Sequence, residues 1–90
     1  EADLRVALGM GEGDPALWQS LAEIAVARRQ WPQAEVAAQK SWELGPRVGA
    51  LCVRNWFTVF ATRIERGDAT GAAAARAKVQ TCVVAEPTRF

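Results

Sequence analysis

The chemistry open to this 90-residue chain starts with its two cysteines, Cys52 and Cys82, because the chain contains no histidine and no tyrosine. Histidine is the most frequent general base and metal ligand in proteins. The two cysteines lie too far apart for a CxxC motif, and without histidine a metal site would have to use carboxylates. We therefore expect no metal site, no cofactor and no catalytic residue in this chain.

Whether the two thiols pair depends on the elements that carry them. Cys52 lies near the start of one predicted helix and Cys82 near the end of the next. In an antiparallel hairpin these ends meet, and the Cα atoms then come within the roughly 4.4–6.8 Å that a disulfide needs. Three alternatives stay open: a disulfide, two buried thiols that stay reduced, and a reactive pair.

A disulfide would have consequences for stability and for location. Closing a loop of about 30 residues adds on the order of 3 kcal/mol in the loop-entropy description. A disulfide also indicates a periplasmic or otherwise extracytoplasmic compartment, since the cytoplasm keeps thiols reduced. Reduced thiols would leave a cytoplasmic location as the alternative.

Other suggestive motifs have simpler explanations. Arg66-Gly67-Asp68 spells an integrin-type tripeptide, but Gly67 stands where a helix should end and Asp68 where the next should begin. The glycine-rich run at residues 9–13 lacks the Lys-Ser/Thr pair of a phosphate loop. Four arginines form either a basic patch or exposed charges at helix ends: Arg28, Arg29, Arg63 and Arg66.

Composition indicates one small folded domain. Half of the residues are hydrophobic, 23% are charged, and the formal net charge is only +1. This balance argues against disorder and against a general nucleic-acid surface. The longest apolar run, near Val48–Val53, is far shorter than the roughly 18 residues of a membrane span, so we expect no membrane insertion.

Helix signals dominate the chain, and no sustained alternation predicts a strand. Asp14-Pro15 starts one helix, Trp31-Pro32 starts a second, and Gly45-Pro46 stops it. A third helix runs from about Gly49 to Arg66, and a fourth, rich in alanine, runs from Ala69 to about Val83. Residues 2–10 look like the end of an earlier helix. We thus predict an all-α fold with about four to five helices.

The two middle helix pairs repeat. A shift of 38 positions places Trp18 on Trp56 and Leu21 on Val59. It also aligns Arg28 with Arg66 and several alanines and lysines of the second helices. A large residue on one helix beside a small one on the next allows two antiparallel helices to approach closely.

This layout resembles the tetratricopeptide repeat (TPR). The first hairpin matches the family pattern at Trp18, Leu21 and Ala22, at the turn aromatic and helix alanine that follow, and at the closing proline. The second copy matches at the corresponding tryptophan, turn glycine and alanine. The complete signature is Trp18, Leu21, Ala22, Trp31, Ala34, Pro46, Trp56, Gly67 and Ala72.

The resemblance has departures. The family spacing is about 34 residues, and the excess around Arg47–Cys52 should lengthen the third helix by roughly one turn. Ala25 and Ala38 replace larger residues, and Trp42 can refill that volume. Phe60 stands where a small residue is usual, which should push the second pair of helices apart. We expect the tryptophans at repeat positions to pack in the core and Trp42 to be partly exposed.

The resemblance implies a single TPR-like domain over residues 1–90, and we interpret it as a C-terminal fragment of a larger bacterial TPR protein. Residues 1–13 would end a preceding repeat, 15–46 and 49–83 would be antiparallel helix hairpins, and 84–90 a tail. Stacked hairpins form an α-solenoid whose concave surface is lined by the first helix of each pair.

In the TPR family this concave surface binds peptides of partner proteins, which implies a non-catalytic scaffold that binds another protein or peptide, in a bacterial envelope assembly. Gln19 and Glu23 replace the carboxylate clamp of chaperone-binding members, which disfavours chaperone tails. The alternatives are an accessory helical domain of a larger enzyme or export machine, and a homo-oligomeric self-association module. The matching positions predict a peptide groove lined by Gln19, Glu23, Val26, Arg54, Phe57, Thr58, Ala61 and Glu65.

Overall fold

The computed structural model describes residues 13–83, and within this range it contains helices and no strand. The four helices are α2 (Pro15–Ala27), α3 (Trp31–Leu44), α4 (Ala50–Glu65) and α5 (Ala69–Thr81). The predicted all-α class is therefore confirmed. The expected helix at residues 2–10 and the tail at 84–90 lie outside the described residues. Of the four helices, none combines the length and the apolar character needed to cross a membrane.

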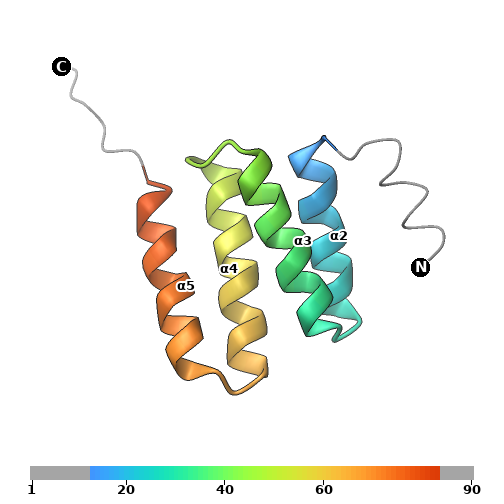
Figure 1. Cartoon of the computed structure of the whole chain (residues 1–90), viewed down its shortest axis with the longest axis vertical. Coiled ribbons are helices and arrows are strands. Elements are labelled where there is room, and N and C mark those ends of the chain that lie inside the picture. The colour runs from blue at the N-terminus through green and yellow to red at the C-terminus, as the bar shows by residue number, and fades with distance from the viewer. Residues whose placement is uncertain (1–12, 84–90) are drawn as a thin grey trace.

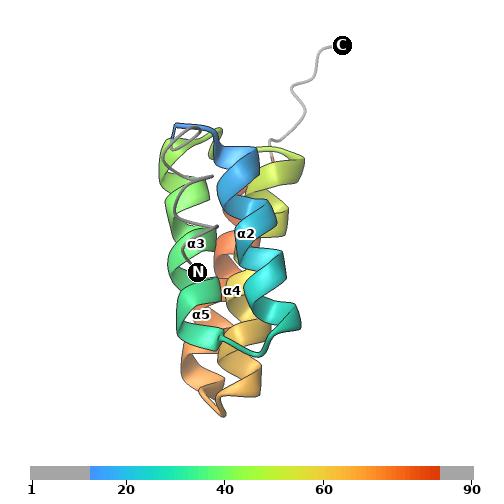
Figure 2. The same ribbon diagram turned by 90° about the vertical axis from the view of Figure 1, so that its right-hand side faces the viewer.

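The helices form two antiparallel hairpins that stand side by side (Figure 1). Each helix packs against the next in the chain, and α2 also contacts α4. The view along the row shows α2 and α3 in different layers, so α2 reaches α4 past the edge of α3 (Figure 2). The first helices of the two hairpins are thus neighbours.

Side-chain caps mark the starts of α2 and α5. The Asp14 carboxylate accepts a hydrogen bond from the backbone N–H of Ala16 at 2.9 Å, and the Asp68 carboxylate accepts one from Gly71 at 2.8 Å. Both use the acceptor that a helix start needs for its unpaired N–H groups. Gly67 has a φ of 77°, which is the left-handed conformation that glycine adopts without strain. Arg66, Gly67 and Asp68 therefore form the turn between α4 and α5.

Alanine dominates the contacts between helices. Ala22, Ala34, Ala38 and Ala75 are at most 2% exposed, and the fully buried Val59 lies among them. Trp56 is 7% exposed, and its ring meets that of Trp42 edge-on at 5.4 Å between centroids. Four further large apolar residues pack on this core while partly exposed: Trp18, Trp42, Val53 and Phe60.

Two cations cover the partly exposed tryptophan. The Arg47 guanidinium lies 4.3 Å from the centre of the Trp42 ring, and the Lys78 ammonium lies 5.1 Å from it. Lys78 also lies 5.6 Å from the Trp56 ring centre. Cations over aromatic faces are attracted by the ring quadrupole, so these side chains complete the packing at the rim of the core.

A buried chain of hydrogen bonds joins three helices. The Ser41 hydroxyl of α3 donates to the backbone carbonyl of Pro15 in α2 at 2.7 Å, and the Asn55 amide of α4 donates to the Ser41 hydroxyl at 2.9 Å. Ser41 and Asn55 are both fully buried. Because a buried polar group without a partner is costly, this chain favours one register of the three helices.

A second polar cluster joins α3, α4 and α5 at the other end of the helices, near the start of α3 and the end of α4. Oε2 of Glu35 in α3 accepts two hydrogen bonds from Arg63 of α4, at 3.2 and 2.6 Å, and Oε1 accepts one from Arg66 at 3.0 Å. Arg63 also donates to the carbonyl of Gly71 in α5 at 3.0 Å. Arg63 and Arg66 are therefore both paired with the Glu35 carboxylate.

Cys52 and Cys82 form a disulfide with a Cα–Cα distance of 5.6 Å. Both residues are fully buried. The backbone N–H of Gly49 donates to the carbonyl of Cys82 at 2.8 Å, so the start of α4 and the end of α5 are joined twice. Of the three alternatives that the sequence left open, the structure contains the disulfide.

Removing the disulfide should destabilise the chain strongly. The double variant Cys52→Ala/Cys82→Ala opens a loop of 30 residues, and we expect its free energy of unfolding to fall by about 3–4 kcal/mol. Urea unfolding followed by circular dichroism measures the change. The unmodified chain treated with a reductant serves as the control, and equal stability with and without reductant would contradict the expectation.

Removing the hydroxyl at the centre of the buried chain should also destabilise the fold. Ser41→Ala leaves the Asn55 amide without its acceptor, and we expect a loss of about 1–3 kcal/mol in the free energy of unfolding. Ser20→Ala is the matched control because Ser20 is an exposed serine of α2. If Ser41→Ala lowers the free energy of unfolding no more than the control does, the chain of hydrogen bonds makes no net contribution to stability.

Candidate functional site

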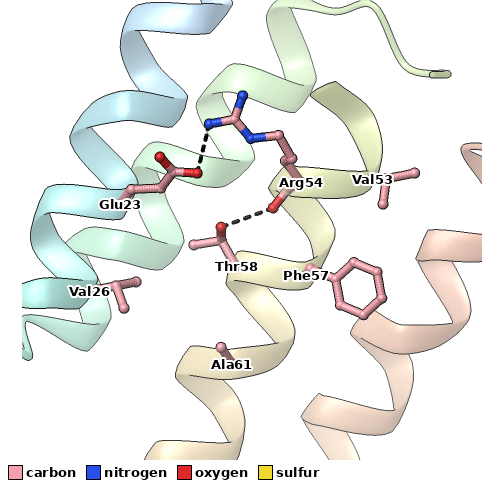
Figure 3. Close-up of a pocket in the computed structure, with 7 residues that line it drawn as sticks. All are labelled: Glu23, Val26, Val53, Arg54, Phe57, Thr58 and Ala61. Carbon is pink, nitrogen blue, oxygen red and sulfur yellow. Dashed lines mark hydrogen bonds and ion pairs between the residues drawn. The ribbon is translucent and has the colours of Figure 1, made fainter. Parts of the chain in front are cut away.

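Six of the eight residues predicted to line a groove surround one pocket between α2 and α4 (Figure 3). The pocket has a volume of about 320 Å³. Of the two remaining residues, Gln19 is 1% exposed beneath the surface, and Glu65 is exposed but does not line the pocket. The lining consists of Glu23 and Val26 from α2 and of Val53, Arg54, Phe57, Thr58 and Ala61 from α4.

Apolar side chains make up most of the lining. Val53, Phe57 and Ala61 follow one another at four-residue intervals, which places them on one face of α4. Phe57 is 48% exposed, and its ring meets Phe60 edge-on at 6.4 Å between centroids. Because Phe60 packs on the core, this contact supports the ring of Phe57 at the surface.

The polar side of the pocket is an ion pair between the two helices. The Arg54 guanidinium donates to the Glu23 carboxylate at 2.7 Å, and the two side chains are 55% and 50% exposed. An ion pair so exposed contributes little to the stability of a fold. Its small contribution to stability does not account for the pair. Its place beside the apolar lining makes it the polar side of the pocket (Figure 3).

Gln19 is buried next to the ion pair and hydrogen-bonds to residues of both helices. Its amide nitrogen donates to the Glu23 carboxylate at 2.9 Å and to the Thr58 hydroxyl at 3.1 Å. The Thr58 hydroxyl in turn donates to the backbone carbonyl of Arg54 at 2.9 Å. Gln19 thus connects α2 to α4 and restrains the side chains of Glu23 and Thr58 at the edge of the pocket.

These contacts change the acidity of Glu23. The hydrogen bond from Arg54 lowers the pKa of Glu23 below its usual value of 4.5, the hydrogen bond from Gln19 acts in the same direction, and partial burial opposes both. A carboxylate with a lowered pKa adds stability above its unfolded pKa and loses that contribution as the pH falls through the folded value. The ion pair is therefore intact at neutral pH and opens in acid.

The predicted groove and the pocket differ at three residues: Val53 lines the pocket without having been predicted, and Gln19 and Glu65 do not line it. Val53 precedes Phe57 by one helical turn, so the spacing of α4 contained the signal that it shares the same face. The repeat position of Gln19 predicts a place on the open surface of the groove. Its burial follows from hydrogen bonds to α4 that no spacing within α2 reveals.

The pocket is mostly apolar with one polar side. It offers an apolar lining next to one donor–acceptor pair, Arg54 and Glu23. Over residues 13–83 the structure contains no group of three cysteine, aspartate or glutamate side chains placed to hold a metal ion. A smaller pocket of about 250 Å³ contains Glu35 and Arg66, whose charges already pair with each other, and Val36.

Comparison of the chain with models of known protein families, with curated proteins and with solved structures finds no match.

The acidity of Glu23 gives a direct test of the ion pair. Arg54→Ala removes the main cause of the lowered pKa, so we expect the Glu23 pKa to rise towards its usual value. Carbon-detected NMR of the Glu23 carboxyl group measures this pKa. The titration covers roughly pH 2–7, where carboxyl groups change their charge. Arg28→Ala, an exposed arginine at the end of α2, should leave the pKa unchanged. An unchanged pKa in Arg54→Ala would mean that the pair does not form in solution.

Proposed function

We propose that this chain is a non-catalytic, TPR-like interaction module that binds a peptide of a partner protein in the pocket between α2 and α4. The observation that carries the proposal is the gathering of Glu23, Val26, Arg54, Phe57, Thr58 and Ala61 around one pocket. In the TPR resemblance the equivalent positions line the concave surface.

The arrangement of helices supports the repeat part of the proposal. Two antiparallel hairpins follow each other, and α2 and α4, their first helices, are in contact. In helical solenoids each repeat packs only on its neighbours, and the first helices line one continuous surface. Trp18 and Trp56, equivalent in the 38-residue repeat, both belong to the packed interior or its edge.

An exposed aromatic ring supports the binding part. Phe57 is nearly half exposed although it lies beside Val53 and Ala61, which together form an apolar stretch of α4. Aromatic side chains in such settings dominate the binding energy of protein interfaces. The ring is also held by Phe60, so little conformational freedom is lost when a partner covers it.

The disulfide supports an extracytoplasmic location for this module, within a bacterial envelope assembly. Buried disulfides persist in oxidising compartments and are rare in the cytoplasm. Counting free thiols in denatured protein taken from its native compartment, with alkylation at the moment of lysis, tests this part. Two free thiols would contradict it.

Binding itself can be tested with displayed peptides. A random peptide library is selected against the 90-residue chain, and the affinity of enriched peptides is measured by calorimetry for the unmodified chain and two variants. We expect Phe57→Ala to weaken binding by about tenfold or more, because it removes an aromatic contact worth at least 1–2 kcal/mol.

Val36→Ala is the matched control, since Val36 is 66% exposed and lies outside this pocket. It should leave the affinity unchanged. Enriched peptides that bind Phe57→Ala as tightly as the unmodified chain would place the binding surface elsewhere, and a selection that enriches no peptide would count against the module as a whole.

A further inference from the structure

We infer that the Glu23–Arg54 pair binds the main chain of an extended, uncharged peptide segment, whose apolar side chain enters the pocket beside Phe57. This inference rests on the proposed function and specifies the chemistry of the partner. It assigns to the ion pair the recognition of main-chain groups and not of a charged side chain.

The first step of the argument is the capacity of the pair. The hydrogen bonds within residues 13–83 use one nitrogen of the Arg54 guanidinium and one oxygen of the Glu23 carboxylate. A guanidinium carries five N–H donors and a carboxylate accepts on both oxygens. Since both side chains are about half exposed, they present donors and an acceptor side by side to a ligand in the pocket.

A peptide unit is the simplest complement to that arrangement. In an extended chain the N–H and the C=O of one residue point to the same side, which is how neighbouring strands exchange two hydrogen bonds. The C=O can accept from Arg54 while the N–H donates to Glu23. A free carboxylate or ammonium would use only one member of the pair and would face the other at close range.

Charge balance supports an uncharged occupant. Glu23 and Arg54 neutralise each other at 2.7 Å, and the remaining lining of the pocket is Val26, Val53, Phe57, Thr58 and Ala61, which carry no charge. A charged side chain entering this pocket would lose hydration without gaining an unpaired opposite charge. The volume of about 320 Å³ suits one large apolar side chain and the adjoining main chain.

Gln19 indicates that the position of the Glu23–Arg54 pair is determined by the packing of α2 on α4. It is 1% exposed, and its amide nitrogen holds both Glu23 and Thr58. Its carbonyl oxygen, in contrast, is buried and accepts no hydrogen bond from residues 13–83. A buried acceptor without a partner costs stability, which offsets part of what the two hydrogen bonds of the Gln19 amide nitrogen contribute. We assign Gln19 as a positioning residue for the pair.

The test uses defined peptides and the complete 90-residue chain. One set consists of acetylated and amidated nonapeptides of serine, threonine and glycine with a single central leucine or phenylalanine. A second set carries aspartate or lysine on both sides of the central residue. A third set repeats the first, but an ester replaces the amide before or after the central residue. Each ester removes one N–H donor and weakens the carbonyl acceptor of the same linkage.

Affinity is measured by ¹H–¹⁵N NMR titration, with the side-chain signal of Arg54 and the backbone signal of Phe57 as reporters. We expect uncharged peptides to bind best and at least one ester replacement to weaken binding by about tenfold, the effect of losing one well-formed hydrogen bond. Arg54→Met should abolish the difference between amide and ester. Arg28→Met, an exposed arginine outside the pocket, is the matched control and should preserve it.

Gln19→Leu separates positioning from stability. We expect this variant to unfold at the same or a higher urea concentration than the unmodified chain, and to lose the amide–ester difference while still depending on Phe57. A purely structural glutamine would instead lower the unfolding midpoint and leave the amide–ester difference intact.

The remaining outcomes distinguish the two proposals. Peptides that bind at Phe57 with equal affinity for amide and ester forms, or that prefer aspartate or lysine flanks, overturn the main-chain inference and leave the proposed function standing. If no peptide of any set shifts the reporters, both fail. Concentration-dependent shifts of the reporters without peptide would identify a second copy of this chain as the occupant, which also overturns the inference.

Discussion

Close approach of helices through alanine is the constraint on which the rest of this structure depends. Ala22, Ala34, Ala38 and Ala75 are almost completely buried where neighbouring helices meet. Small side chains bring backbones close, but each buries little apolar area, and a domain of this size has little surface to bury in any case. Such a core favours several packings of similar energy unless other contacts select one of them.

Polar contacts and the disulfide supply that selection at both ends of the helices. Ser41 and Asn55 join α2, α3 and α4 near the start of α4, and the disulfide joins α4 to α5 at the same end. Glu35 gathers the opposite end through Arg63, which also reaches α5. The candidate pocket lies on α2 and α4 between these two levels. The side chains of the pocket therefore belong to helices whose relative positions are restrained by contacts at both ends.

The sequence predicted what is local and left open what depends on crossing helices. Asp14-Pro15, Gly45-Pro46 and Gly67-Asp68 mark helix ends because capping and backbone conformation are decided within a few residues. The disulfide was one of three alternatives, since spacing shows that two thiols can meet and not that they do. The pairing of Glu35 with Arg63 and the burial of Gln19 depend on which side chains face each other across helices. The sequence spacing of one helix carries no such information.

The position of α5 gives the disulfide a further consequence. Among the described helices α5 packs mainly on α4 and reaches α3 through Lys78 at the Trp42 ring, whereas α2 packs on both α3 and α4. A helix held mainly by one neighbour is prone to open locally from a helical array. The bond from Cys82 to Cys52 keeps a detached α5 beside its docking surface, at an effective concentration in the millimolar range or above. Detachment then becomes a brief local opening followed by rebinding, and the alanine face of α5 is rarely offered to other chains.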